Sequence, residues 1–278
     1  MSADGAHRHR PLRGWQSGGP PLIVLAIVIG VWELISQVVM TPDRRRVLLP
    51  PPESTVQDGF LEWDHLSEIL SGLWLTSQVT VLGLAISAVI GVTVAVIMSQ
   101  ARWVERMVHP YAVVLQTIPI IAIVPIIGLW FSFAFRSRVL VAVIISLFPI
   151  ITNTLFGLKS VDRGLEDLFT LHRSNRRTRL WKLRARAAQP SFFTGLRIAA
   201  GMAVIGSIVG DFFFRRGDQM GLGRLLSVYH SRVQPTLLFT TIFFSSMLGL
   251  TLFVASGLLG RFMTRAWYVP ARRTRHRR

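Results

Sequence analysis

Long apolar blocks dominate this sequence and restrict what it can fold into. Six stretches of about 20 or more mostly apolar residues alternate with shorter polar segments. A helix of that length crosses the hydrocarbon core of a bilayer, about 30 Å thick, whereas buried helices of soluble proteins are usually shorter. Charged residues make up 16% of the chain, below the roughly 25% usual for soluble domains. The sequence therefore predicts an all-α polytopic membrane protein with about six transmembrane helices.

The predicted transmembrane domain covers residues 21–260, between a basic N-terminal tail at 1–20 and a basic C-terminal tail at 261–278. A polar segment at 159–194 separates the fourth apolar block from the fifth. The expected spans are 21–40, 73–98, 108–132, 138–158, 195–214 and 236–260.

The first block could be mistaken for the apolar core of a signal peptide. It is longer than a usual signal core, and Thr41-Pro42-Asp43 is a poor cleavage site, so we expect a retained first span. With both termini in the cytoplasm, the cytoplasmic segments hold 21 Lys and Arg and the external segments hold 8, leaving out Arg138 and Arg197 at span ends. Because Lys and Arg concentrate in cytoplasmic loops, this excess predicts cytoplasmic N- and C-termini.

The external segment 41–72 is expected to contain a short surface helix. Pro50-Pro51-Pro52 favours an extended course. After it, Val56, Phe60 and Trp63 fall at the spacing of one helical face, which predicts an amphipathic helix at the outer membrane surface.

Small residues recur at every fourth position in two of the spans. Such stripes let helix backbones approach closely. From the residues alone, packing within one subunit and a role as a subunit interface or moving surface both remain open. The stripes are Gly83, Ser87, Gly91 and Ala95 in the second span, and Ala199, Ala203, Gly206 and Gly210 in the fifth.

Prolines inside the third and fourth spans predict kinks, since each removes a backbone hydrogen bond. Broken backbone is tolerated at membrane depth where it faces protein or a water-filled path. Polar side chains near these prolines are therefore candidates for lining a translocation path. These candidates are Gln116, Thr117, Pro119, Asn153 and Thr154.

Several classes of function are disfavoured by the composition. The chain has no cysteine, its seven histidines show no metal-ligand spacing, and no catalytic triad or carboxylate pair is apparent. No Gly-rich loop followed by Lys-Ser or Lys-Thr is present, so ATP hydrolysis would need another polypeptide. The net charge of +17 resides in tails and loops, which indicates membrane orientation rather than nucleic-acid binding. We predict neither an enzyme nor a bound cofactor or metal.

The segment 159–194 is the longest predicted cytoplasmic loop. Leu165, Leu168, Phe169 and His172 fall at i, i+3, i+4 and i+7, which predicts a short helix with one apolar face. Glu166 and Asp167 in its first turns favour the helix dipole. That face could pack into a groove on a cytosolic partner or lie on the membrane surface, and the pattern does not choose between them.

The order of several short motifs resembles the permease subunits of bacterial ATP-binding-cassette (ABC) importers. The similar branch includes nitrate, sulfonate and taurine permeases, and permeases for riboflavin or pyrimidine precursors are also similar. The motifs are Leu49-Pro50-Pro51-Pro52, Gln116-Thr117-Ile118-Pro119, Leu129-Trp130-Phe131, Phe148-Pro149-Ile150, Gly195-Leu196-Arg197-Ile198-Ala199 and Gly221-Leu222-Gly223.

In that family the cytoplasmic loop carries a coupling motif that docks on the ATPase. Laid on this chain, its Glu-Ala-Ala positions become Asp167, Leu168 and Phe169, and its glycine position becomes Arg173. Glycine at such a place provides a positive φ or a close backbone approach, so arginine is a departure from the motif. The resemblance implies that coupling involves Glu166, Asp167, Leu168, Phe169, His172 and Arg173.

The resemblance implies a type I ABC importer permease fold in the bacterial inner membrane. The implied partners are cytosolic ABC ATPases, an external solute-binding protein and a second permease subunit, forming a homodimer. The expected cargo is a small organic solute, either a sulfonate- or nitrate-like anion or a vitamin precursor such as riboflavin or a pyrimidine. A secondary transporter or channel without an ATPase is the alternative.

Overall fold

The computed structural model describes residues 19–132, 134–214 and 220–265, and within these ranges it contains helices but no strand. The predicted tails fall mostly outside the described residues. In chain order the helices and π-helical turns are α1 (Gly19–Leu34), η1 (Ile35–Val39), α2 (Pro42–Val47), α3 (Pro52–Val56), η2 (Gln57–Leu61), α4 (Trp63–Gln100), α5 (Arg102–Thr117), α6 (Ile120–Phe131), α7 (Phe135–Lys159), α8 (Arg163–Leu171), α9 (Arg176–Arg179), η3 (Leu180–Arg184), α10 (Ala185–Phe213), α11 (Leu222–Ser231) and α12 (Pro235–Thr264).

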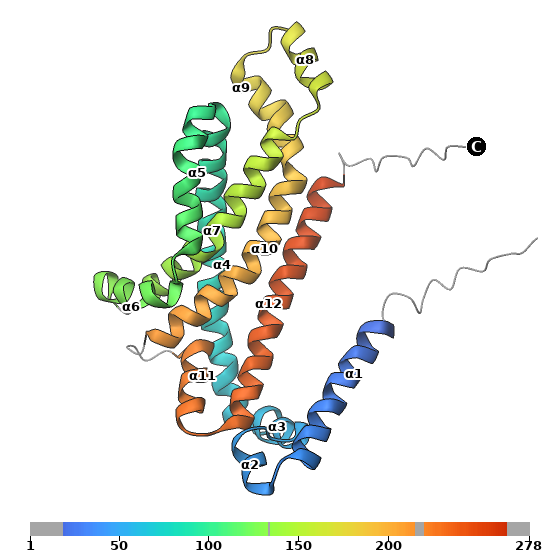
Figure 1. Ribbon diagram of the computed structural model, residues 1–278, viewed down its shortest axis with the longest axis vertical. Helices are drawn as coiled ribbons and strands as arrows, with labels where there is room; N and C mark the ends of the chain where they lie inside the picture. Colours follow the sequence, from blue (N-terminus) through green and yellow to red (C-terminus); the bar gives the residue numbers. More distant parts are fainter. Residues whose placement is uncertain (1–18, 133, 215–219, 266–278) are drawn as a thin grey trace, which may run out of the picture.

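The centre of the bundle is α7, which packs against α4 on one side and α10 on the other (Figure 1). The stripe of small residues on α4 faces α7. A Cβ added at Gly83 would lie 2.7 Å from the Cβ of Ala142, and one at Gly91 would lie 2.7 Å from Ile150. Ser146 donates a hydrogen bond to Ser87 across the same contact, at 2.9 Å. The small residues therefore allow these two helices to pack closely.

The second stripe, on α10, meets the other side of α7. Ala199 and Ala203 are fully buried, and a Cβ at Gly206 would lie 2.9 Å from the Cα of Ala142. Both stripes thus serve packing within one subunit, which decides between the two alternatives that the sequence left open. Close backbone approach gains van der Waals contact, which is the main source of helix association in lipid.

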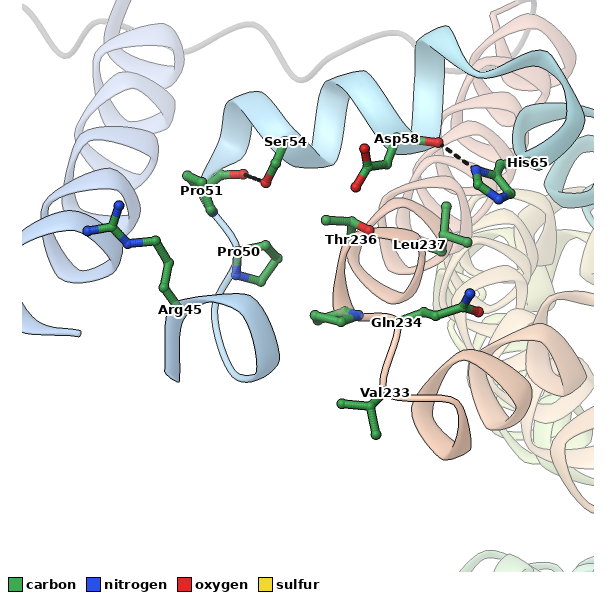
Figure 2. A pocket seen from close by; sticks show the side chains of 11 residues that line it. Arg45, Pro50, Pro51, Ser54, Asp58, His65, Val233, Gln234, Thr236 and Leu237 are labelled. Atoms are coloured by element: carbon green, nitrogen blue, oxygen red, sulfur yellow. Dashed lines mark hydrogen bonds between the residues drawn. The ribbon is translucent and has the colours of Figure 1, made fainter. Parts of the chain in front are cut away.

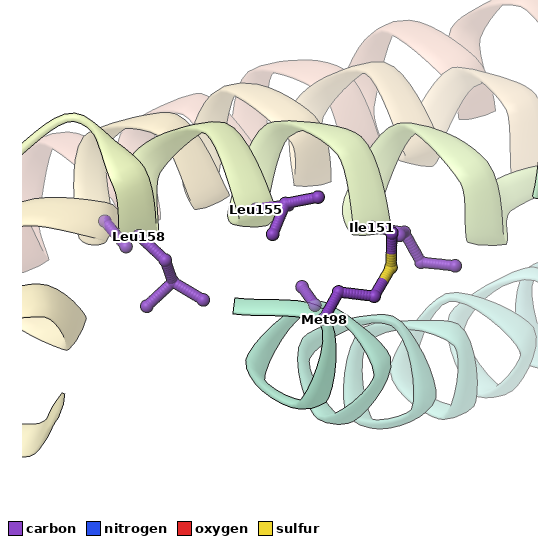
Figure 3. Packing of buried hydrophobic residues seen from close by; sticks show 6 residues of the cluster. Met98, Ile151, Leu155 and Leu158 are labelled. Atoms are coloured by element: carbon purple, nitrogen blue, oxygen red, sulfur yellow. The ribbon is translucent and has the colours of Figure 1, made fainter. Parts of the chain in front are cut away.

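An apolar cluster closes the bundle at the end where α4 and α7 terminate. Met98 of α4 packs against Ile151, Leu155 and Leu158 of α7 (Figure 3). Ala188 of α10 belongs to the same cluster, so three helices are joined there. This end of the bundle also carries α8 and α9, which stand beyond the ends of the long helices (Figure 1).

Five helical stretches among the described residues are long and apolar enough to cross a membrane. The stretches are Leu22–Val39, Trp63–Gln100, Phe135–Lys159, Arg176–Phe213 and Pro235–Thr264. Trp63–Gln100 and Arg176–Phe213 begin well before the predicted spans 73–98 and 195–214. The predicted short helix after the prolines is present as α3 and η2, which carry Val56 and Phe60, but Trp63 was wrongly assigned to it, because Trp63 begins α4. Its place at the outer membrane surface stays a prediction. The helix α10 begins at Ala185, inside the predicted loop.

The predicted third span, 108–132, is not one helix. It divides into α5 and the 12-residue α6 at Ile118 and Pro119, both of which have extended backbone. Proline lacks the N–H that would continue the helix, and it pushes the preceding residue out of the helical region. The bilayer crossing by this segment stays a prediction.

The first helix contacts the bundle only near its end. Trp32 stacks on Phe239 of α12 with ring centroids 5.2 Å apart, and its indole N–H donates to the carbonyl oxygen of Pro50 at 3.0 Å. Ser36 donates to the carbonyl oxygen of Leu49 at 2.9 Å. Most of the remaining apolar side chains of α1 are exposed, and the helix leans away from the bundle (Figure 1).

Candidate functional site

The helix α8 is closed at both ends by its own residues. At its N-terminus the carboxylate of Asp162 accepts a hydrogen bond from the amide of Gly164, at 2.8 Å. At its C-terminus the amides of Arg173 and Ser174 donate to the carbonyl oxygens of Thr170 and Phe169, at 2.9 and 3.0 Å. These two nested hydrogen bonds form a Schellman motif, which satisfies carbonyl groups that a helix end leaves free. The short helix therefore has little need of outside partners for its backbone.

Arg173 occupies the position of that motif which glycine usually fills. Its φ is 48°, in the left-handed region that glycine adopts without steric cost. The expectation of a positive φ at this place is met, although the residue is arginine. A left-handed conformation costs a residue with a Cβ about 1–2 kcal/mol. The surrounding hydrogen bonds hold the turn in spite of that cost.

The predicted apolar face of α8 lies open. Leu165 of that face is 50% exposed and Leu168 is 55% exposed, and no residue of α8 is buried. Leu171, which the prediction did not include, is 83% exposed. Phe169 is partly covered. The other predicted coupling residues, Asp167, His172 and Arg173, are exposed as well. The helix thus presents leucines that the described chain leaves half exposed or more.

Glu166 differs from the other predicted coupling residues because it points back to its own chain. Its carboxylate pairs with the guanidinium of Arg184, with Oε1 at 2.9 Å from one terminal nitrogen and 3.2 Å from Nε. Arg179 also donates to the hydroxyl of Thr170, at 3.2 Å. These side chains tie α8 to the helical turns that continue into α10. A push on α8 therefore has a direct connection to a long helix of the bundle.

The five predicted path residues lie in two different surroundings. Gln116, Thr117 and Pro119 are exposed at the break between α5 and α6. Asn153 of α7 donates to the carbonyl oxygen of Pro149 at 2.8 Å and faces α10. Thr154 is 4% exposed. The structure of the single chain does not bring these residues into one group.

Thr154 lines an apolar cavity of about 310 Å³ between α4, α7 and α10. Valines of α4, Leu158 and Phe192 form much of the wall, and Trp181 is also part of it. The hydroxyl of Thr154 has no hydrogen-bond partner among the described residues. A buried hydroxyl in such a place can bind a polar atom of a guest molecule.

The opposite end of the bundle holds a buried ion pair. Nε of Arg138, at the start of α7, lies 3.2 Å from Oδ1 of Asp211, near the end of α10, and the two side chains are only 5% and 3% exposed. The other carboxylate oxygen accepts the amide of Arg224, and Thr76 accepts the amide of Leu222, both at 2.9 Å. Side chains of α4 and α10 thus satisfy two free amides at the N-terminus of α11.

The sequence analysis placed Arg138 at the end of a span, but it did not pair it with Asp211. The order of the spans could have indicated this pair, because α7 begins and α10 ends at the same side of the membrane.

The packing of α11 gives a reason for the two glycines of the Gly221-Leu222-Gly223 motif. A Cβ at Gly223 would overlap the carbonyl oxygen of Ile208, so glycine allows α11 to sit against α10.

A groove of about 510 Å³ opens at this same end, between the segment after α1 and the start of α12 (Figure 2). Arg45 lies on one side, and Asp58 and His65 lie on the other. The imidazole Nδ1 of His65 is 3.0 Å from the carbonyl oxygen of Asp58 and 2.6 Å from the carboxylate of Glu62. Groups of both charges therefore border the opening.

Comparison with known proteins assigns the chain to a family. Residues 87–266 match the family model described as "Binding-protein-dependent transport system inner membrane component". The formylaminopyrimidine transport permease protein ThiX of Halalkalibacterium halodurans is 36% identical over 245 residues, which are 87% of this chain and 93% of that protein. The riboflavin transport system permease protein RibX of Chloroflexus aurantiacus is 34% identical over 164 residues, 59% of this chain and 60% of that protein.

Solved structures show the same fold. A chain of the MetNI methionine ABC transporter, in inward-facing conformations, superposes with a TM-score of 0.65 at 18% identity, covering 73% of this chain and all of that chain. The fold and the family model agree with each other and with the apolar helices of the described chain. The chain therefore belongs to the family of binding-protein-dependent transport system inner membrane components, the membrane-spanning permease subunits of ABC importers.

Proposed function

We propose that this chain forms the membrane path of an importer for a small organic solute, and that α8 couples the path to cytosolic ABC ATPases. The main support for this proposal is the exposed apolar face of α8, a helix that is otherwise bound to its own chain. Leu165, Leu168 and Leu171 are at least half exposed, while Glu166 is held by Arg184. An amphipathic helix of this kind fits an apolar groove on a partner protein.

The connection between α8 and the bundle supports a mechanical role. The Glu166–Arg184 pair and the Arg179–Thr170 hydrogen bond link α8 to the turns that run without a break into α10. In the proposed mechanism, ATP binding closes the ATPases, α8 follows the motion, and α10 and α7 shift together. Hydrolysis resets the path. The solute is released toward the cytoplasm by alternating access.

The end that carries α8 is proposed to be cytoplasmic, with both termini on that side. The excess of 21 Lys and Arg over 8 supports this orientation. The end with α2, α3 and α11 would then meet the external solute-binding protein. The groove beside Asp58 and His65 offers charged groups for that contact.

A second copy of the chain is the proposed partner within the membrane. The apolar residues of α1 are largely exposed and the helix contacts its own bundle only near its end. Gln116, Thr117 and Pro119 are also exposed at the broken backbone between α5 and α6. We propose that these residues, with Asn153 and Thr154, line a path that is completed by the second subunit.

The proposed cargo class is a neutral or weakly charged heterocycle, such as a vitamin precursor. The relative that supports it is the formylaminopyrimidine permease, at 36% identity over 93% of its length. In the described spans, Arg138 pairs with Asp211, and the guanidinium carbon of Arg197 lies 3.9 Å from the centroid of the Phe253 ring. These engaged arginines give no particular support to an anionic sulfonate or nitrate.

The coupling assignment can be tested with a pair of matched variants. Leu165→Asp with Leu168→Asp removes the apolar face of α8, while Leu48→Asp with Leu61→Asp makes the same change at exposed leucines of the opposite end. The full-length permease is purified from membranes with its ATPase, which is identified by mass spectrometry and by ATP hydrolysis. We expect the α8 variant to lose ATPase and solute uptake by more than about tenfold, because each buried leucine is worth about 1.5–3 kcal/mol.

The control variant should retain its ATPase on purification and its basal ATP hydrolysis; uptake is compared only for the α8 variant, because Leu48 and Leu61 lie at the end proposed to meet the solute-binding protein. If the α8 variant keeps its ATPase and its uptake, the coupling assignment is wrong. If uptake by the unaltered chain persists in vesicles without ATP and follows an ion gradient, the secondary-transporter alternative replaces the importer.

A further inference from the structure

A second groove lies at the α8 end of the bundle, on the side of α5. Its volume is about 560 Å³. Its walls come from the first turns of α5 and from the last residue of α7. The lining residues are Arg102, Glu105, Arg106, His109, Pro110 and Lys159.

The groove carries an excess of positive charge. Arg102, Arg106 and Lys159 are its basic side chains, and the one carboxylate among the lining residues, Glu105, pairs with Lys159. Arg102 and Arg106 are exposed and stand four residues apart on the same helix face. Like charges at this spacing repel, and the N-terminal end of a helix favours anions over cations. A bound anion in the groove would reduce the repulsion between the two arginines and would interact favourably with the N-terminal end of the helix.

An apolar stripe runs along α5 next to these cations. Trp103 is 66% exposed, Met107 60% and Tyr111 72%, and their spacing of four residues puts them on one face. Tryptophan and tyrosine are typical of the membrane–water interface, where the ring contacts acyl chains and the polar atom contacts headgroups. The stripe then leads toward the apolar helix α6.

We propose that this groove binds the headgroup of an anionic phospholipid such as phosphatidylglycerol. The phosphodiester would lie between Arg102, Arg106 and Lys159, and the acyl chains would follow Trp103, Met107 and Tyr111. Basic pockets at membrane depth beside helices recognise anionic headgroups in this way. The occupant is a lipid rather than free phosphate because the apolar stripe adjoins the cations.

The site would also regulate coupling, a consequence that depends on the proposed function of α8. Lys159 ends α7, and Asp162, the N-terminal cap of α8, follows after two residues. A lipid that holds Lys159 would restrict the hinge from which α8 extends. The binding itself does not depend on that role, so it can be tested alone.

The experiment titrates the full-length, delipidated permease in neutral detergent with short-chain phosphatidylglycerol and measures bound lipid by native mass spectrometry. Parallel arms use phosphatidylcholine of the same chain length and inorganic phosphate. The variant Arg102→Gln/Arg106→Gln removes two groove cations. The control Arg177→Gln/Lys182→Gln removes two exposed cations outside the groove.

We expect the groove variant to weaken phosphatidylglycerol binding by about 30-fold, since each basic residue near an anionic lipid contributes about 1 kcal/mol. The control should change it by no more than about twofold. Glu105→Gln should act in the opposite direction and tighten binding, because it removes the competing carboxylate. Equal weakening in the control, equal binding of phosphatidylcholine, or displacement of the lipid by an equal concentration of phosphate would each overturn the proposal.

Discussion

The buried pair of Arg138 and Asp211 allows a sharp test of how this bundle is held together. The perturbation is a double-mutant cycle of Arg138→Met and Asp211→Asn. Asparagine keeps an oxygen that can still accept the amide of Arg224, which Asp211 now accepts at 2.9 Å. The cycle therefore changes the charges and leaves the cap of α11 in place.

The structure sets the expected size of the effect. The charged atoms are 3.2 Å apart and the side chains are 5% and 3% exposed, so water cannot replace a lost partner. Removal of one member of a buried pair costs about 3–5 kcal/mol, whereas removal of both charges together is often close to neutral. Each single variant should lose about 3–5 kcal/mol, and the double variant only about 1–2 kcal/mol.

The assay is thermal unfolding of the purified chain in detergent. One kcal/mol corresponds to about 2–4 °C for a chain of this size, so each single variant should unfold about 10 °C lower. The exposed Arg177→Met is the control and should shift the transition by less than about 2 °C. If the double variant loses the sum of the two single losses, Arg138 and Asp211 contribute independently and the argument from mutual neutralisation is refuted.

Three further changes follow from the same structure. Arg173→Gly should relieve about 1 kcal/mol of backbone strain and slow amide exchange at Ser174 about fivefold, without loss of ATPase coupling; faster exchange or a clear loss of coupling would contradict this. Thr76→Val leaves a buried amide of α11 without an acceptor and should cost about 1–2 kcal/mol in thermal unfolding. Gly91→Val puts a Cβ 2.7 Å from α7 and should cost about 1–3 kcal/mol, whereas Gly30→Val, with open space around it, should cost little; equal losses would refute the close α4–α7 contact.

The helical bundle could be predicted because the sequence patterns that specify its helices are local. Apolar blocks of membrane length set the long helices, and the four-residue spacing of Gly83, Ser87 and Gly91 marked the face that meets α7. The helix start at Trp63 could not be predicted in this way. Gly72 lies between the amphipathic turns and the apolar block but does not interrupt the helix, so periodicity favoured two elements where the backbone continues as one.

The tertiary part of the site was not accessible to the same reasoning. Arg138 and Asp211 lie far apart in sequence, and only the antiparallel packing of α7 and α10 brings them together. Glu166 was included among the coupling residues because the family resemblance implied it. Its ion pair with Arg184 depends on how the chain folds back through α9 and η3, which no short-range pattern encodes.

Arg173 shows how a departure from a motif can preserve its geometry. The left-handed turn is made by the amides of Arg173 and Ser174, and a side chain does not prevent either bond. Val233 does the same at the end of α11, with φ of 55°: its amide donates to the carbonyl oxygen of His230, and the amide of Gln234 donates to that of Tyr229. This chain thus accepts the cost of a Cβ at two helix ends. What arginine changes in α8 is therefore the exposed charge beside its leucines, which a partner ATPase would meet directly.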